Sequence, residues 1–346
     1  MDFSPTEEQA AARELAARIF GDLATPERLG ATGATGGDPE LWKALCAAGL
    51  VGAVGELGLL GLVLVLEEQG RTTAQVPYAA SCVHGLLAVT AHGTPEQRER
   101  LLPGIVDGSV VVSGAFPAQP GVRAAPGGRL TGTVPVVPWL RDATHVLVAD
   151  ADRRLWLTPL GDGAEVTPVE LTAPWSAGGL TLDGAHAERL GDGDGDGGAY
   201  SDVLATARVA FAGLQAGVCA GALARVVAHV NGREQFGRPL ATRQAVQLRA
   251  ADAHMDTEAI RVTAYEAAWR RDAGLPYATH ALTAAWWASE AGQRVVHTGQ
   301  HLHGGAGADL GHPVHRHFLW GRQLDAYLGC GDEILQELGE SIADAE

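Results

Sequence analysis

The hydrophobic pattern of this 346-residue chain changes its period twice. Residues 1–110 follow a helical period, residues 111–202 favour strands, and helical periodicity returns over residues 203–346. This order predicts an α+β fold with an N-terminal helical domain, a middle antiparallel β-domain and a C-terminal four-helix bundle over those three ranges. The chain is also too long for one compact core.

Start and stop signals place several helices. Ser4 is a candidate N-cap, Pro5 suits the first helical position, and Glu7 completes a capping box. A short amphipathic helix from Pro95 is expected to stop at Pro103. In the last part of the chain we expect long helices over residues 204–231, 242–273, 277–302 and 313–339.

Turns rich in Gly, Asp and Pro separate the strand-like segments of the middle region. An antiparallel sheet or a small barrel is expected there. The predicted strands cover residues 110–116, 129–137, 144–151, 154–160, 165–171 and 179–184.

The net charge of −16 argues against nucleic acid or an anionic membrane as the main partner. An anionic cofactor would need a local cluster of arginines, helix N-termini or backbone N–H groups. The longest apolar run, residues 57–66, contains glycine and is too short to span a bilayer. The acidic N-terminus does not look like a secretory signal, and no C-x-x-C pair occurs, so buried free thiols in the cytoplasm are expected.

Two glycine-containing segments could bind an anion. In GREQFGRPL, residues 232–240, Arg233 and loop amides could hold a phosphate, although a polar turn between two helices explains the same residues. In HLHGGAG, residues 301–307, the backbone could approach a pyrophosphate closely. No strand precedes this segment, so it is not a dinucleotide-binding fingerprint, and an ordinary helix C-cap also fits it.

Two further patterns suggest metal ions only superficially. Residues 191–198 begin like a calcium loop, but Val203 stands where a bidentate glutamate belongs, so a surface turn is expected. Five histidines crowd one region without a carboxylate or cysteine to complete a ligand set, and no metal site is expected. These are His301, His303, His312, His315 and His317.

Together these segments resemble the acyl-CoA dehydrogenase family along nearly the whole chain. MDFSPTEEQ, LWKALCAAGLVGAVGE and VLEEQGRTTAQVPYAA are similar to its first domain, and LTGTVPVV with DATHVLVA to its β-domain. R-x-x-F-G followed by the glycine turn is the most specific part. The resemblance implies that these residues hold the FAD of a neighbouring subunit, and it assigns that role to Arg233, Phe236, Gly237, Gln244, His301, Gly304 and Gly305.

The family removes hydrogen from the α- and β-carbons of an acyl-CoA thioester. A glutamate takes the α-proton while a hydride passes to the flavin. This chain departs from that pattern, because Leu328 and Ala207 occupy the two usual glutamate positions. His301 replaces a glutamine, and residues 115–120 are a reduced form of the segment that normally contacts the flavin ring.

The chain therefore resembles the glutamate-lacking subunit of actinobacterial heterotetrameric acyl-CoA dehydrogenases, some of which act in steroid breakdown. The resemblance implies an α2β2 assembly with a paralogous subunit that supplies the base, one FAD per pair of unlike subunits, and electron-transfer flavoprotein or a similar acceptor. One alternative is a self-sufficient enzyme with a relocated base, Asp325, Asp332 or Glu333. Another is a structural paralogue without flavin, which would not need the retained flavin-binding residues.

Overall fold

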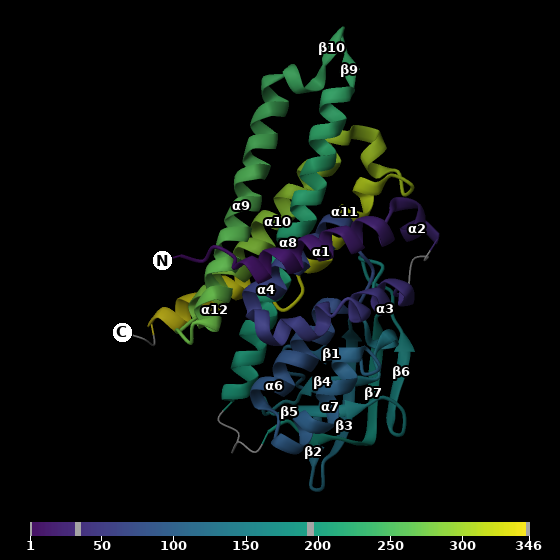
Figure 1. Ribbon diagram of the computed structural model, residues 1–346, viewed down its shortest axis with the longest axis vertical. Coiled ribbons are helices and arrows are strands. Elements are labelled where there is room, and N and C mark those ends of the chain that lie inside the picture. Colours follow the sequence, from purple (N-terminus) through teal and green to yellow (C-terminus); the bar gives the residue numbers. More distant parts are fainter. Residues whose placement is uncertain (1, 32–35, 192–196, 344–346) are drawn as a thin grey trace. The chain divides into compact units, whose positions relative to one another are not determined.

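The computed structural model describes residues 2–31, 36–191 and 197–343 (Figure 1). By spatial contact the chain forms two compact units, each assembled from separate stretches. The bundle unit comprises Met1–Ala31, Leu59–Ala74 and Arg208–Glu346, and the sheet unit comprises Thr32–Gly58 and Gln75–Ala207. The division into three consecutive domains stays a prediction. Most of the calcium-like loop, residues 192–196, lies outside the described residues.

The bundle unit is helical, and α9 and α10 lie side by side in it (Figure 1). Its elements are α1 (Glu7–Leu23), α2 (Pro26–Ala31), β9 (Glu234–Gln235), β10 (Arg238–Pro239), α9 (Gln244–Asp272), α10 (Ala278–His303), α11 (Pro313–Asp325) and α12 (Gly331–Ala343). Two 3-10 turns, Leu240–Thr242 and Gly304–Ala308, belong to it as well. Two long helices, α4 (Leu50–Thr72) and α8 (Gly198–Gly232), contribute residues to both units.

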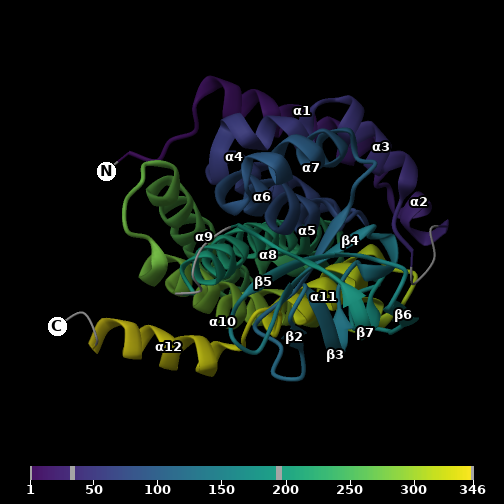
Figure 2. The same ribbon diagram turned by 90° about the horizontal axis from the view of Figure 1, so that it is seen from below.

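The sheet unit contains two four-stranded sheets with the orders β1-β4-β5-β8 and β2-β3-β7-β6, and Figure 2 shows the second order. Its strands are β1 (Val112–Ala115), β2 (Arg123–Ala125), β3 (Arg129–Val137), β4 (His145–Ala149), β5 (Leu155–Pro159), β6 (Ala164–Pro168), β7 (Gly178–His186) and β8 (Glu188–Arg189). Its helices are α3 (Pro39–Ala47), α5 (Tyr78–Ala80), a π-helix (Ser81–Leu87), α6 (Ala88–His92) and α7 (Pro95–Asp107).

All six predicted strands are confirmed, but the purely antiparallel arrangement is wrong. β1 pairs with β4 in parallel, so the first sheet is mixed. The β2–β3 hairpin lies between these two strands in the sequence and gives the chain the length that a parallel return requires. Buried residues of β3, β4 and β7, such as Val134, Val148 and Leu180, form one apolar core.

Two helix ends differ from the prediction. α1 begins with Thr6 as its N-cap: the Thr6 hydroxyl accepts the N–H of Gln9, and the Gln9 side chain accepts the N–H of Thr6. This reciprocal pair lies beyond Ser4, so the earlier start was wrong. α7 continues through Pro103 to Asp107. Burial of Leu101 and Ile105 on either side of the proline outweighs the backbone hydrogen bond that the proline cannot make.

The last predicted helix is two helices. α11 ends at Asp325 and α12 begins at Gly331. Between them Leu328 has a φ of 67° and Gly329 a φ of 117°, conformations that interrupt a right-handed helix. The break therefore falls on Leu328, the residue predicted to occupy the usual glutamate position.

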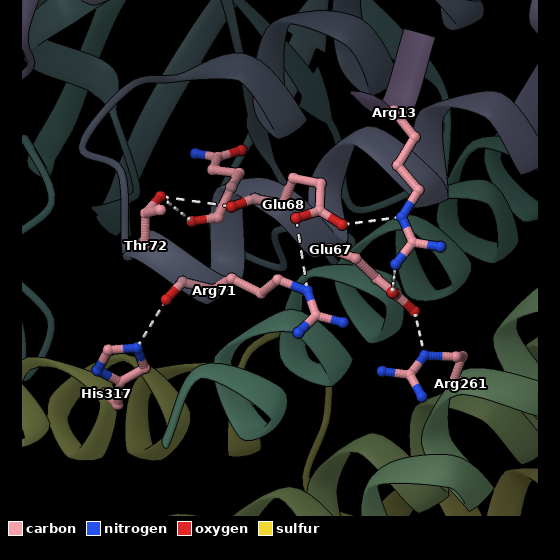
Figure 3. A network of polar contacts seen from close by, with 8 residues as sticks. Arg13, Glu67, Glu68, Arg71, Thr72, Arg261 and His317 are labelled. Carbon is pink, nitrogen blue, oxygen red and sulfur yellow. Dashed lines mark hydrogen bonds and ion pairs between the residues drawn. The ribbon is translucent and has the colours of Figure 1, made fainter. Parts of the chain in front are cut away.

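A buried ion-pair network joins α1, α4 and α9 within the bundle unit (Figure 3). The Glu67 side chain is fully buried; its Oε1 accepts a 2.9 Å hydrogen bond from Arg261 Nε, and its Oε2 lies 3.6 Å from Arg13 Nη2. Arg13 also donates to Glu68 at 2.8 Å. Asp272, the last residue of α9, accepts the N–H groups of Leu59 and Leu60 on α4. These contacts fix three helices of the unit that contains the candidate site.

Two helices, α4 and α8, are long and apolar enough to cross a membrane by length and composition alone. However, 67% and 83% of their apolar windows are buried inside the protein, which is typical of core helices. All four cysteines are free; Cys82 and Cys219 are buried, whereas Cys330 is exposed, so the expectation that every thiol is buried was wrong.

Candidate functional site

The bundle unit contains a pocket of about 550 Å³. Its lining combines residues of α8, the β9–β10 hairpin, the N-terminal part of α9 and the glycine turn after α10. Four of the seven predicted flavin-binding residues line it, namely Arg233, His301, Gly304 and Gly305. His229 and His303 add two imidazoles, and Leu240, Val246 and Leu302 supply an apolar wall.

The glycine turn leaves open space beside this pocket. Gly304 has a φ of 60° and a ψ of −138°, a conformation that strains any residue with a Cβ atom. A Cβ placed on Gly304 or on Gly305 would meet no atom within 4 Å. At Gly307, by contrast, it would lie 2.6 Å from the Gln300 carbonyl, so that glycine is required for packing.

Phe236 and Gly237 form the tip of the β9–β10 hairpin. Their φ angles of 55° and 74° match a tight two-residue turn, a conformation that Phe adopts only at a cost. The Phe236 ring is 91% exposed, and the Arg243 guanidinium lies 5.3 Å from its centroid. Gln244 is the exposed first residue of α9. In the described chain, these predicted residues are outside the pocket lining.

The pocket has a basic environment. Burial, followed by the nearby His312 and Arg233, lowers the pKa of His229. Burial also lowers the pKa of His303, with smaller contributions from His229, His312 and Arg225. Among the described lining residues there is no carboxylate. In a chain of net charge −16, this local excess of basic groups with exposed glycine backbone fits an anionic group such as a diphosphate.

Both residues that the sequence comparison predicts at the glutamate positions are buried and aliphatic: Ala207 is fully buried and Leu328 is 4% exposed. Leu328 lines a cavity of only about 20 Å³. Next to it, Nη1 and Nη2 of Arg208 donate to the Glu337 carboxylate at 2.8 and 2.7 Å. Nε and the same Nη2 donate to the Leu328 carbonyl at 3.4 and 3.5 Å. No sequence pattern indicates this pair, because Arg208 and Glu337 are 129 residues apart.

The carboxylates considered as relocated bases have structural partners or face solvent. Asp325 accepts a 2.9 Å hydrogen bond from the Ser289 hydroxyl and pairs with Arg322 at 2.8 Å. Glu333 accepts the backbone N–H of Cys330 at the start of α12, and this hydrogen bond lowers the pKa of Glu333. Asp332 is exposed in the first turn of α12.

In the sheet unit, residues 115–120 are engaged by the chain itself. The Phe116 ring stacks between His84 and Tyr200, with centroids 5.2 and 5.9 Å away. The Ala118 N–H donates to the Tyr200 hydroxyl at 3.2 Å, and the Gln119 N–H donates to a backbone carbonyl at 2.8 Å. The backbone donors of Ala118 and Gln119 are therefore already used within the chain.

No group of three or more His, Cys, Asp or Glu residues in the described ranges is arranged to hold a metal ion. The five histidines of residues 301–317 lie apart: His301 and His303 line the pocket, His312 is the N-cap of α11, and His315 and His317 lie on α11. His317, for example, is fully buried and contacts the backbone carbonyls of Pro313 and Arg71.

The model of the acyl-CoA dehydrogenase N-terminal domain matches residues 6–109, and that of the C-terminal domain matches residues 195–342. This chain belongs to the acyl-CoA dehydrogenase family. Acyl-CoA dehydrogenase FadE27 of Mycobacterium tuberculosis is 35% identical over 89% of each chain. A variant of the "Tcur3481-Tcur3483 steroid ACAD" superposes with a TM-score of 0.91 at 42% identity over 98% of each chain. The "ChsE4-ChsE5 complex from Mycobacterium tuberculosis" does so with a TM-score of 0.91 at 33% identity over 99% of each chain.

The family and its fold are thus confirmed, and the chain is related to oxidoreductases. A helical N-terminal domain, middle β-sheets and a helical C-terminal domain are as expected from the sequence. The roles of the individual site residues stay predictions.

Proposed function

We propose that this chain is one subunit of a two-subunit, FAD-dependent acyl-CoA dehydrogenase whose catalytic base comes from a paralogous partner. One contrast carries the proposal: the bundle unit keeps a basic, glycine-lined pocket, whereas Leu328 stands at the position of the base. The relatives described as Tcur3481-Tcur3483 and as the ChsE4-ChsE5 complex are named as pairs, which supports a paralogous partner for this chain.

FAD, when bound, supplies the acceptor for the substrate hydride. In this chain Arg233, His301 and the backbone of Gly304 and Gly305 would hold its diphosphate. Phe236, Gly237 and Gln244 would contact the flavin or the subunit that carries it; the 91% exposure of Phe236 supports a role outside this chain's own core.

The base must come from elsewhere because no side chain at the usual positions accepts a proton. A general base has to lie within hydrogen-bonding reach of the α-proton. Leu328 and Ala207 carry no such group, and the nearby Glu337 is held by Arg208. These observations support a partner-supplied glutamate over a relocated carboxylate.

The acyl group is proposed to be steroid-derived, because one close relative is described as a steroid ACAD. The substrate would be a CoA thioester, the electron acceptor an electron-transfer flavoprotein or a similar protein, and the site of action the cytoplasm. The stack of His84, Phe116 and Tyr200 supports one FAD for each pair of unlike chains, since residues 115–120 are closed around their own contacts.

Co-purification with a glutamate-containing paralogue tests the proposal. We expect one FAD per pair of chains, turnover of an acyl-CoA with a dye acceptor by the pair, and no turnover by this chain alone. One FAD per chain would contradict the stoichiometry. Robust turnover by the single chain would contradict the missing base and make Asp325→Asn and Glu333→Gln the next variants. A flavin-free, inactive pair would favour a structural paralogue.

A further inference from the structure

Three histidines from three different elements gather at the pocket of the bundle unit. His229 lies on α8, His303 ends α10 and His312 is the N-cap of α11. The ring centroids of His229 and His303 are 4.5 Å apart, and those of His303 and His312 are 5.0 Å apart. We call these residues the histidine cluster. Two of them, His229 and His303, line the pocket itself.

The charged groups that act on His229 and His303 among the described residues are basic. These groups are Arg225 on α8, Arg233 directly after α8, and the other histidines of the cluster. His301 is a further basic residue of the pocket lining. The carboxylate of Asp309, in the loop between the glycine turn and α11, accepts the N–H of Gly311. Because burial and these neighbours lower the pKa of His229 and His303, both rings favour the neutral form until a negative charge enters.

The hydrogen bonds assign the tautomers of two rings. Nδ1 of His303 lies 2.7 Å from the carbonyl oxygen of Gly299, so it carries the proton and donates it. Nε2 of neutral His303 is therefore an acceptor and can donate to an anion only after protonation. Nδ1 of His312 accepts the N–H of Val314 at 3.2 Å, so its proton is on Nε2. His303 and His229 line the pocket, so these two rings are the groups that would gain a proton.

We propose that the histidine cluster is a phosphate-binding device that takes up a proton when a diphosphate enters the pocket beside Arg233 and the Gly304–Gly305 turn. The identification of that ligand as FAD rests on the proposed function; the proton uptake does not. A metal-binding role is disfavoured, because no group of described residues is arranged as a metal site.

The energetic consequence is a pH-dependent affinity. A nearby charge of opposite sign shifts a pKa by about 1–3 units, so a bound diphosphate would raise the pKa of the histidine ring beside it. By linkage, uptake of one proton raises the affinity up to roughly tenfold for each unit by which the pH falls. The affinity for a diphosphate should therefore be higher at pH ~6 than at pH ~8.

Calorimetry of the full chain with ADP-ribose tests the proposal without the partner. Both phosphates of ADP-ribose are esterified and do not titrate between about pH 6 and pH 8, so any proton exchanged belongs to the protein. Titrations at pH ~7 in two buffers of different ionisation enthalpy give the number of protons taken up. We expect a net uptake of protons by the native chain and a clearly smaller uptake by His303→Gln.

Two other variants keep the test informative. His229→Gln changes a half-buried ring of the same cluster and should also reduce the uptake, even if His303→Gln folds poorly. His254→Gln changes an exposed histidine of α9, outside the described pocket lining, and should leave the uptake intact. Circular dichroism confirms that each variant is folded.

Absence of ADP-ribose binding, or binding without proton uptake, would overturn the proposal. So would an uptake that persists in both cluster variants. Failure of the proposed function gives a different result. The two-subunit complex would then have the wrong number of flavins or no turnover, while the single chain would still take up a proton with ADP-ribose.

Discussion

Replacement of Arg261 by methionine should destabilise the chain, because it removes the nearest cation from a buried carboxylate and leaves only the more distant Arg13. Glu67 is fully buried, and Arg261 supplies its 2.9 Å hydrogen bond, whereas Arg13 lies 3.6 Å away (Figure 3). Removal of one partner from a buried ion pair costs about 3–5 kcal/mol, since the remaining charge has no compensation. That is a large share of the ~5–15 kcal/mol that stabilises an ordinary domain.

The cost should depend on pH with a defined sign. Burial raises the pKa of Glu67, and Arg261 is the strongest of the groups that oppose this rise. Arg261→Met should raise the pKa further, so folded protein binds a proton that unfolded protein, with a pKa near ~4.3, releases. Stability is then retained at low pH and lost as the pH rises through the folded-state pKa. The variant should be damaged less at pH ~5 than at pH ~8.

Urea unfolding followed by circular dichroism at both pH values measures these differences. Arg294→Met is the matched control, because the Arg294 side chain is 50% exposed and its pair with Asp256 should contribute only about 0–1 kcal/mol. The double variant Glu67→Leu/Arg261→Met should recover at least about 2 kcal/mol, since it removes the isolated charge. A loss below about 1 kcal/mol for Arg261→Met at pH ~8 would refute the argument.

Three further outcomes are expected. Arg233→Ala should weaken FAD retention in the assembled enzyme roughly tenfold to a hundredfold, which is the effect of losing one charge-assisted hydrogen bond. Arg249→Ala changes an exposed residue of α9 and should leave FAD retention unchanged. Flavin fluorescence on dilution measures the release of FAD. Gly305→Val should fold normally, because a Cβ at this position meets no atom within 4 Å. It should nevertheless reduce flavin retention, because the side chain fills space beside the pocket. An unchanged dissociation constant for FAD would place the ligand elsewhere. Burial lowers the pKa of His84 to about 4, so the unfolded chain is protonated first as the pH falls and stability drops from pH ~6.5 downward. His84→Phe should lessen the loss between pH ~7 and pH ~4.5 by about 2 kcal/mol in urea unfolding, and the exposed control His186→Phe should not.

Much of the candidate site could be predicted from short motifs. Arg233 and the Gly304–Gly305 turn are far apart in the sequence, and the resemblance to a family linked them before the structure brought both to one pocket. His229 gave no signal, because a single histidine on a helix has many explanations. Its partners His303 and His312 were noted only as a crowd, since a sequence does not show which rings stack.

The break at Leu328 illustrates a similar limit. Gly329 is a visible stop signal, but apolar periodicity continued on both sides and favoured one helix. A residue with a Cβ atom adopts a φ of 67° only where surrounding contacts hold it, and here Arg208 binds the Leu328 carbonyl from another helix. No local pattern contains that contact.

The sequence alone determined the helix–strand–helix order and the six principal strands, because periodicity and residue chemistry are local properties; that Leu328 and Ala207 replace the usual base stays a prediction. Tertiary structure alone decided the parallel pairing of β1 with β4, the pairing of Arg208 with Glu337, and the three-element histidine cluster. Each of these depends on which distant segments share a surface. Burial of side chains such as Glu67 and His303 determines how far their pKa values shift, and side chains become buried only when the chain folds.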